Sequence, residues 1–396
     1  MPMGYALRLR SKGFDVEYIV DVPKANALSR PEFHYDEIHY PYPEWIKERI
    51  VRIPSFKTLL PAFFFKKILS EITSADIYFL CDWYISLAPF LPKKAKIIIL
   101  PHGADLDTWC DLNKANDISR VGRYSIFWPI KKIIALIIIN NMRKGLLRAD
   151  AITYYPAGLN RSGDAVVEEF RRINNKVIVR RYDVNFSSAA KFKGQFKVRN
   201  GPLRLCSAVR FDYVEQKDVK NEYLKGCDII IKGVAKFYKE YSKDIEIIFF
   251  NKGCDVEAAK KLCIKENIDN VVTWRDSVPF KELLKIIDGS DICFDQVGRH
   301  WVGAVGAFSL YLGKPLIANY RPDVLDAFFV GNNPICQAQS VDDVFNHLVK
   351  LDNETIRREI SIKCREFAVT NFSIDGALSS YLGIIESQVN IINSLT

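Results

Sequence analysis

Residues 294–319 of the chain read FDQVGRHWVGAVGAFSLYLGKPLIAN. An apolar run ending at Phe294 is followed by Asp295 and Gln296, a glycine-rich stretch, an apolar helical segment, a Gly-Lys-Pro stop and a second apolar run. Glycines let a backbone approach a bound group closely, and the amides at a helix N-terminus attract anions. The stretch therefore predicts a strand–loop–helix–strand unit with a ligand at its loop.

The same alternation of strands and helices extends to both sides of this stretch. In the second half, apolar runs predict strands at 203–209, 245–250, 270–274, 292–295, 315–319 and 334–338, with helical patterns between them. In the first half, strands are expected at 16–20, 75–80, 94–100, 149–156 and 177–184. Strands that alternate with helices predict an α/β class with parallel sheets.

The length of 396 residues predicts two domains. We expect a Rossmann-like domain at 1–185, a polar, basic linker at 186–202, a second Rossmann-like domain at 203–370, and a helix at 371–396 that crosses back to the first domain. Two such doubly wound domains would face each other across a cleft. The helix near Gly4 leaves no room for a first strand, so we expect the N-terminal sheet to lack it, the true start lying upstream.

Composition narrows the class of partner. A formal net charge of +9 suits anionic ligands, although a lysine-rich surface would give the same number. No basic stripe with interleaved aromatics appears, which argues against nucleic acid. The nine cysteines stand singly, which favours a reducing, cytoplasmic compartment and argues against zinc, and we expect no metal site.

The chain contains no signal-peptide pattern and no apolar run long enough to span a membrane. The nearest segment is 124–148, whose uninterrupted apolar run is only 133–139. Two interpretations stay open: a helix lying on an anionic membrane surface, or a buried helix with charged ends. The expected location is cytoplasmic, with possible peripheral contact at the inner membrane face.

Three groups of residues carry candidate chemistry. Arg210, after a strand, and Lys225, before a helix, would clamp a diphosphate, or they form a solvated basic loop. Asp295 would accept hydrogen bonds from hydroxyls, and amides near Gly303 would hold phosphate; alternatively the glycines serve packing and Asp295 caps a helix. His102 at a strand end would contact a reacting group, although a single histidine is more often structural.

Together, these groups resemble the GT-B glycosyltransferases, specifically family 4 (glycosyl transferases group 1). The resemblance is strongest over 203–320. SAVRFDY…KGCDIIIKGVAKF looks like the family's Arg…Lys-Gly-x-Asp donor-diphosphate motif, DICFDQVGRHWVGAVGAFSLYLGKPLIAN like its donor segment, and PHGADL like its His-Gly-Ser/Thr-Asp element.

The resemblance implies roles for these residues. Arg210 and Lys225 would neutralise the donor diphosphate, and His102 would face the transferred sugar or its phosphates. Trp274 and Arg275 would lie near the nucleobase. The remaining donor-site residues would contact the nucleotide sugar: Asp295, Gln296, His300 and Gly303.

One departure from the family pattern concerns its two glutamates, which are eight positions apart. Counted back from Gly313, these positions hold His300 and Phe308, and neither is acidic. Asp295 is then the candidate acceptor for the ribose hydroxyls.

The expected function is a hexosyltransferase-type glycosyltransferase, retaining and metal-independent, without a cofactor. It would move a sugar from a nucleotide sugar to a glycan or lipid-linked acceptor in bacterial-type polysaccharide or glycoconjugate biosynthesis. Two alternatives stay open. One is a GT-B nucleotide-sugar epimerase, and the other is a non-catalytic protein that binds a nucleotide sugar or a partner enzyme.

Overall fold

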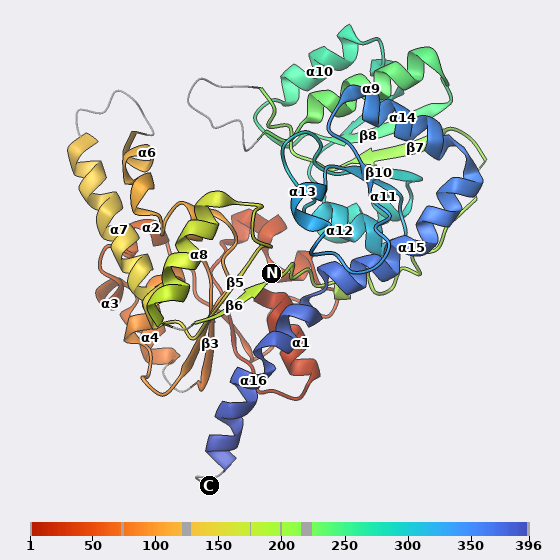
Figure 1. Cartoon of the computed structure of the whole chain (residues 1–396). Helices are drawn as coiled ribbons and strands as arrows, with labels where there is room; N and C mark the ends of the chain where they lie inside the picture. Colours follow the sequence, from red (N-terminus) through yellow and green to blue (C-terminus); the bar gives the residue numbers. More distant parts are fainter. Residues whose placement is uncertain are drawn as a thin grey trace. The chain divides into compact units, whose positions relative to one another are not determined.

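The computed structural model describes residues 2–72, 75–120, 128–174, 176–198, 200–214 and 224–393. The chain divides into two compact units (Figure 1). Unit 1 comprises Met1–Pro23, Tyr42–Asp183 and Ile374–Thr396, and unit 2 comprises Lys24–Pro41 and Val184–Ser373.

Unit 2 is built on one six-stranded sheet in which every pair of neighbouring strands is parallel. The strand order is β12-β11-β10-β7-β8-β9, so the chain winds outward in both directions from the pair β7 and β10. The strands are β7 (Leu203–Ser207), β8 (Ile245–Phe250), β9 (Val272–Arg275), β10 (Ile292–Phe294), β11 (Leu316–Ala318) and β12 (Cys336–Gln337). This is the predicted doubly wound arrangement.

Helices cover the unit 2 sheet in two groups. Helix α9 packs against α10 and α14, while α12 packs against α11 and α15 (Figure 1). The helices are α9 (Cys227–Glu240), α10 (Val256–Lys265), α11 (Phe280–Asp288), α12 (Ala304–Tyr311), α13 (Pro322–Leu325), α14 (Val341–Asp352) and α15 (Glu354–Phe372). The apolar runs predicted as strands are the core of this unit, because parallel strands covered on both faces are apolar throughout.

Unit 1 divides its parallel strands between two sheets. One has the order β3-β4-β5-β6, and the other is the pair β1-β2. Among the described residues, no strand pairing joins the two sheets. The strands are β1 (Tyr18–Val20), β2 (Ile46–Glu48), β3 (Ile77–Leu80), β4 (Lys96–Ile99), β5 (Ala151–Tyr154) and β6 (Val177–Arg180).

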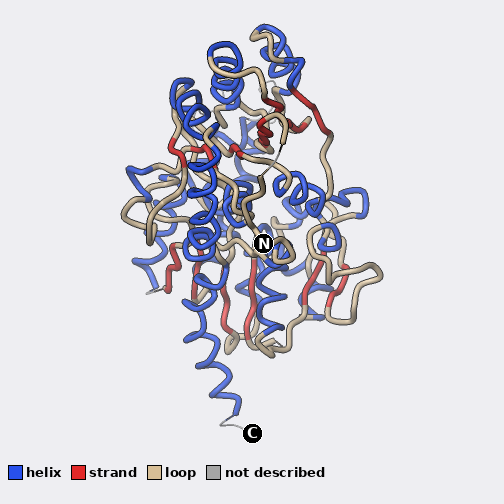
Figure 2. Tube along the Cα trace, turned by 90° about the vertical axis from the view of Figure 1, so that its right-hand side faces the viewer, coloured by secondary structure: helices blue, strands red, loops and turns tan. Residues whose placement is uncertain are grey.

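The helices of unit 1 come from both ends of the chain. Helix α16 (Ile374–Asn393) supplies buried side chains to one core with α1 and strands β4–β6, and its last turns extend beyond the other elements of the unit (Figure 2). The other helices are α1 (Pro2–Ser11), α2 (Pro54–Lys57), α3 (Pro61–Phe64), α4 (Lys66–Glu71), α5 (Ala104–Asp107), α6 (Ala115–Arg120), α7 (Trp128–Arg148) and α8 (Arg161–Asn174).

Helix α7 accounts for most of the segment singled out at 124–148, of which 124–127 lie outside the described residues. Among the described residues, no helix is both long enough and apolar enough to cross a bilayer.

Two segments lie elsewhere than the sequence prediction placed them. Lys24–Pro41 was assigned to the first domain but belongs to unit 2, where Lys281 pairs with Asp36 at 2.7 Å and the His34 and Phe280 rings lie 5.3 Å apart. The stretch 186–198 was predicted as a linker, yet it also belongs to unit 2. The Arg365 guanidinium on α15 donates a 2.8 Å hydrogen bond to the Phe192 carbonyl there.

Candidate functional site

The two central strands of unit 2 mark the first candidate site. In open α/β sheets, ligands bind beyond the carboxyl ends of the strands at the point where the strand order reverses. That point lies between β7 and β10. Arg210 follows β7 and Asp295 follows β10, so both predicted site residues flank it.

Lys225 interacts electrostatically with both of these residues. The pKa of the Lys225 ammonium is lowered to about 8, chiefly by burial and also by the neighbouring Arg210 guanidinium, while the Asp295 carboxyl acts in the opposite direction. Since these side chains influence one another electrostatically, the fold brings Arg210, Lys225 and Asp295 together. Arg210 keeps an exposed side chain, with its Nε atom 3.4 Å from the Asp212 carboxylate.

The backbone around Lys225 is held on both sides. Its amide donates a 2.9 Å hydrogen bond to the Asp212 carbonyl, and its own carbonyl accepts one of 3.3 Å from the Val297 amide. Gly226 has φ +71°, and a Cβ added there would lie 2.1 Å from the Val297 carbonyl oxygen. The Lys-Gly pair therefore packs directly on the glycine-rich segment, which a freely solvated basic loop would not do.

Asp295 is buried, with 3% of its surface exposed. Its Oδ2 atom accepts hydrogen bonds of 2.7 Å from the Gly303 amide and 3.0 Å from the Gly306 amide. Burial raises the pKa of the Asp295 carboxyl above its usual range, while these amides favour the ionised form. Asp295 thus caps α12, the structural alternative considered for it, and its contact with ribose hydroxyls stays a prediction.

The other residues of the glycine-rich segment are held by neighbours within unit 2. Gln296 Nε2 donates a 2.8 Å hydrogen bond to the Trp301 carbonyl, whereas its buried Oε1 has no partner in the described part of the chain. His300 is buried, and the centroid of its ring lies 4.2 Å from the centroid of the Trp301 ring. A Cβ added to Gly303 would lie 3.1 Å from Gln296 Nε2, so this glycine permits packing against the Gln296 side chain.

Phe308 occupies one of the two expected glutamate positions and is part of an aromatic cluster. Its ring lies 4.8 Å from Phe280 and 5.3 Å from Phe186, both in edge contact. The Phe186 ring stacks on Tyr311 at 4.3 Å. An acidic side chain at position 308 would be surrounded by aromatic rings, so its replacement by phenylalanine is accommodated by packing.

Trp274 and Arg275, expected near the nucleobase, end the edge strand β9. The Trp274 ring packs 5.2 Å from Phe211 and 5.3 Å from Phe249. Arg275 is exposed, and its carbonyl accepts a 2.7 Å hydrogen bond from the Asn251 amide. Trp274 therefore contributes to the core of unit 2, and a nucleobase contact by either residue stays a prediction.

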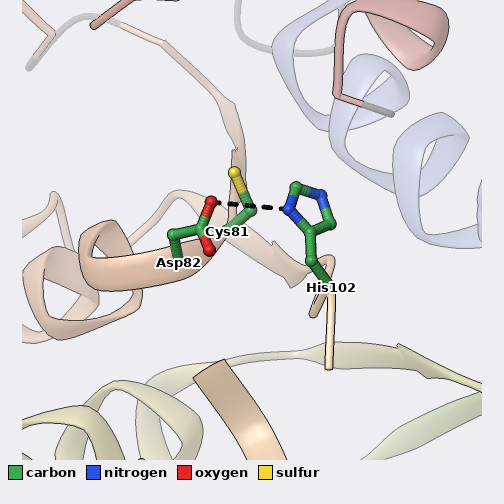
Figure 3. A group of neighbouring side chains, drawn as sticks. All are labelled: Cys81, Asp82 and His102. Carbon is green, nitrogen blue, oxygen red and sulfur yellow. Dashed lines mark ion pairs between the residues drawn. The ribbon is translucent and has the colours of Figure 1, made fainter. Parts of the chain in front are cut away.

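His102 lies at a second candidate site, in unit 1, where neighbouring strands β3 and β4 end (Figure 3). Its Nδ1 atom is 3.4 Å from an oxygen of Asp82, the second residue after β3. Its Nε2 atom is buried and has no partner among the described residues. An available ring nitrogen suits contact with a substrate atom.

Asp105 fixes the two loops of this second site. Its carboxylate accepts hydrogen bonds from the amides of Asp82 at 3.0 Å, His102 at 2.9 Å and Gly103 at 3.0 Å. Burial and the nearby Asp82 carboxylate raise the pKa of Asp105 to about 6. Asp105 belongs to the PHGADL stretch that resembles the His-Gly-Ser/Thr-Asp element, but no role was predicted for it from the sequence.

Sequence analysis also assigned no role to Cys81 and Asp82, which follow β3 directly. Their position after a predicted strand was the available signal, since the carboxyl ends of adjacent parallel strands meet at one sheet edge. The proximity of the Cys81 thiol to His102 could not be predicted from the sequence, because it depends on which strands are neighbours in the sheet.

No protein-family model matches this sequence, and no curated protein is similar to it in sequence. Solved structures do resemble it. Sucrose-phosphate synthase from Thermosynechococcus elongatus has a TM-score of 0.55 at 14% identity, covering 97% of this chain and 91% of that one. WaaG, a glycosyltransferase involved in lipopolysaccharide biosynthesis, has a TM-score of 0.53 at 11% identity, covering 96% and 94%. The chain has the GT-B fold.

The GT-B fold confirms the predicted class of two Rossmann-like domains. A putative UDP-N-acetylglucosamine 2-epimerase from Listeria monocytogenes resembles the chain as well, with a TM-score of 0.53 at 11% identity over 98% of this chain and 92% of that one. At these identities the likeness establishes the GT-B fold, and the same fold serves both transfer and epimerisation.

Proposed function

We propose that this GT-B protein is a glycosyltransferase that moves a hexosyl group from a nucleotide sugar to an acceptor hydroxyl. The observation that carries the proposal is the pairing of Arg210 and Lys225 at the switch point of the unit 2 sheet. Two cations at that point suit a diphosphate, which carries negative charge before transfer and gains more as the leaving group departs.

Each cation suits a different part of that task. The exposed Arg210 guanidinium can reach a ligand and bind two phosphate oxygens side by side. Lys225 is partly desolvated, so its charge interacts strongly with an anion that displaces water. Because these side chains neutralise the diphosphate, we propose that the donor is bound without a metal ion and that no cofactor is needed.

We assign the remaining roles by the family 4 resemblance, which also implies a retaining outcome. His102 contacts substrate through its unpartnered Nε2 atom, and the Arg275 side chain is available to the nucleobase. The acceptor is a glycan or a lipid-linked glycan of polysaccharide or glycoconjugate biosynthesis.

We further propose that unit 1 contacts a membrane surface, placing the enzyme at the inner face of the membrane. Helix α7 exposes Trp128, Ile130 and Ile133, and Lys132 lies 5.7 Å over the Trp128 ring. The Asn141 side chain on α7 donates a 2.8 Å hydrogen bond to the Thr58 carbonyl, between α2 and α3.

Helices α2 and α3 lie near α7 (Figure 1). Four apolar side chains in and beside them are more than half exposed: Ile53, Phe56, Leu60 and Phe63. Exposed aromatics bordered by lysines fit the interface of an anionic bilayer, where the rings enter the headgroup region and the ammonium groups meet lipid phosphates.

The second candidate function is a nucleotide-sugar epimerase, favoured by the likeness to the Listeria structure. An epimerase must remove and return a proton on the sugar and so requires an acid and a base at it. Product analysis separates the two functions, because an epimerase converts a nucleotide sugar without an acceptor. A non-catalytic nucleotide-sugar binder would do neither.

Calorimetry with UDP, GDP and UDP-N-acetylglucosamine as probes tests the donor site. Arg210→Ala and Lys225→Ala should each weaken binding by about 1.5–3 kcal/mol, or roughly ten- to hundredfold. The matched control is Lys232→Ala, which removes an exposed lysine paired with Asp228 on α9. Unchanged affinity in both site variants would refute the assignment of the donor site.

A further inference from the structure

Three side chains of metal-binding type converge where β3 and β4 end in unit 1. The Cys81 thiol, an Asp82 carboxylate oxygen and a His102 ring nitrogen all lie within 4.8 Å of one another. Figure 3 shows the Cys81 sulfur and the Asp82 carboxylate facing the same edge of the His102 ring. The three groups come from two loops on adjacent parallel strands.

The spacing between two of these groups matches that of ligands sharing one ion. His102 Nδ1 lies 3.4 Å from Asp82 Oδ2, longer than an ordinary nitrogen–oxygen hydrogen bond. Two ligands about 2.0–2.1 Å from a tetrahedral zinc ion stand about 3.3 Å apart. An ion between them would therefore require little movement of either side chain.

The loops that carry the three groups are held in place. Asp105 accepts hydrogen bonds from the amides of Asp82, His102 and Gly103, so it ties both loops together without offering itself as a ligand. Asp82 has φ +49°, a left-handed conformation that few non-glycine residues adopt. Strained backbone held by its surroundings is frequent at binding sites.

The types of ligand select the class of ion. Thiolate and imidazole favour zinc and similar transition metals over magnesium or calcium, which prefer oxygen alone. Three protein ligands leave one tetrahedral position for water or a substrate atom. The Asp82 side chain is 54% exposed, so an ion can reach the group from solvent.

Charge also favours a cation here, because Asp82 brings a carboxylate oxygen close to the Cys81 sulfur and the His102 ring. A divalent ion displaces the proton of a thiol that binds it. An ion pair between His102 and Asp82 involves two of the three groups, whereas a shared ion would use all three.

We propose that Cys81, Asp82 and His102 bind one zinc-class divalent cation. The ion takes the Cys81 sulfur, one Asp82 oxygen and His102 Nδ1, the thiol proton passes to solvent, and His102 Nε2 stays available. The single, unpaired cysteines of the sequence argued against zinc, but this site needs only one thiol. The proposal does not require sugar transfer or the diphosphate site in unit 2, and it leaves His102 Nε2 for the substrate contact proposed above.

Cobalt(II) titration of the full-length chain, stripped of metal with a chelator, provides the test. One equivalent of Co²⁺ should give the visible bands of a tetrahedral site together with near-ultraviolet thiolate-to-cobalt charge transfer. Zn²⁺ should displace it. Cys81→Ser should abolish the charge-transfer band, whereas Cys254→Ser, which changes an exposed thiol in unit 2, should retain it.

Two further variants keep the test decisive if Cys81→Ser fails to fold. Asp82→Asn and His102→Gln should each weaken Co²⁺ binding at least tenfold. The matched control is Asp76→Asn, which changes an exposed carboxylate preceding β3, at the opposite end of that strand. The proposal is overturned if the wild-type chain gives no charge-transfer band, or if Asp82→Asn and Asp76→Asn bind Co²⁺ equally well.

Discussion

The buried backbone amide of Gly306 donates a 3.0 Å hydrogen bond to the carboxylate of Asp295. An internal carboxyl group therefore already occupies the start of α12, where the sequence predicted bound phosphate. A substrate group that reached these amides would have to displace the carboxylate, so the diphosphate is better placed at Arg210 and Lys225.

Removing the Asp295 carboxylate should destabilise unit 2. Asp295→Ala leaves the Gly306 amide buried without its acceptor, and we expect the free energy of unfolding to fall by about 1–3 kcal/mol in urea denaturation. Asp295→Asn keeps one acceptor oxygen and should lose less. If Asp295 acts only as a cap, UDP and its 2′,3′-dideoxy analogue should lose affinity by the same factor; a larger loss for UDP would show a ribose contact.

Gly226 should tolerate no side chain. Its φ of +71° costs alanine about 1–2 kcal/mol, and the added Cβ would also lie 2.1 Å from the Val297 carbonyl oxygen. Gly331→Ala is the matched control, because Gly331 has φ +85° and nothing within 4 Å of an added Cβ. We expect Gly226→Ala to lower both stability and UDP affinity well beyond Gly331→Ala, whereas equal losses would mean that the contact with Val297 is unimportant.

Lys225 should make stability depend on alkaline pH. Its folded-state pKa of about 8 lies below the ordinary value of 10.5, so between these values the unfolded chain holds a proton that the folded chain has released. The free energy of unfolding should therefore rise with pH across this window, by roughly 2–3 kcal/mol from this group. Urea denaturation at about pH 7.5 and about pH 10 measures the rise.

The comparison for that measurement is Lys225→Met, which should remove the rise. Lys232→Met takes the same charge from an exposed position on α9 and should keep it. A rise of equal size in wild-type and Lys225→Met proteins would show that other groups cause it.

The apolar surface of α2 and α3 should direct binding to anionic vesicles. The double variant Phe56→Ser, Phe63→Ser removes two exposed rings from unit 1 and should reduce co-sedimentation with phosphatidylglycerol vesicles severalfold. Ile264→Ser, which changes an exposed apolar residue on α10 in unit 2, should not. Equal binding to vesicles of phosphatidylcholine alone would contradict the role given to the lysines.

Local pattern was sufficient to predict most of unit 2. Its strands are short apolar runs between helical segments, and a strand buried on both faces has that signature whatever its neighbours are. In unit 1, strand β2 (Ile46–Glu48) was not predicted, because three residues within a polar, aromatic stretch are too few to show the alternating pattern of a strand. The place of Lys24–Pro41 in unit 2 depends on contacts such as Lys281 with Asp36, more than two hundred residues apart in sequence.

The candidate sites were predictable in position more than in detail. That Arg210, Lys225 and Asp295 lie near one another follows from strand ends meeting at a switch point. The orientation of the Asp295 carboxylate toward α12 could not be predicted in this way, because it depends on the side-chain rotamer and on the path of the loop. To predict that Cys81 and His102 are neighbours, one would have to know that β3 pairs with β4.

The interleaving of the two units has a consequence for synthesis on the ribosome. The chain passes between units after Pro23, Pro41, Asp183 and Ser373, and Tyr381 and Ile385 of α16 are part of the core that also contains Tyr5. The core of unit 1 is thus incomplete until α16 has been translated, after all of unit 2. Until then Tyr5 and its apolar neighbours lack their partners on α16, and we expect nascent unit 1 to expose apolar surface on which chaperones act.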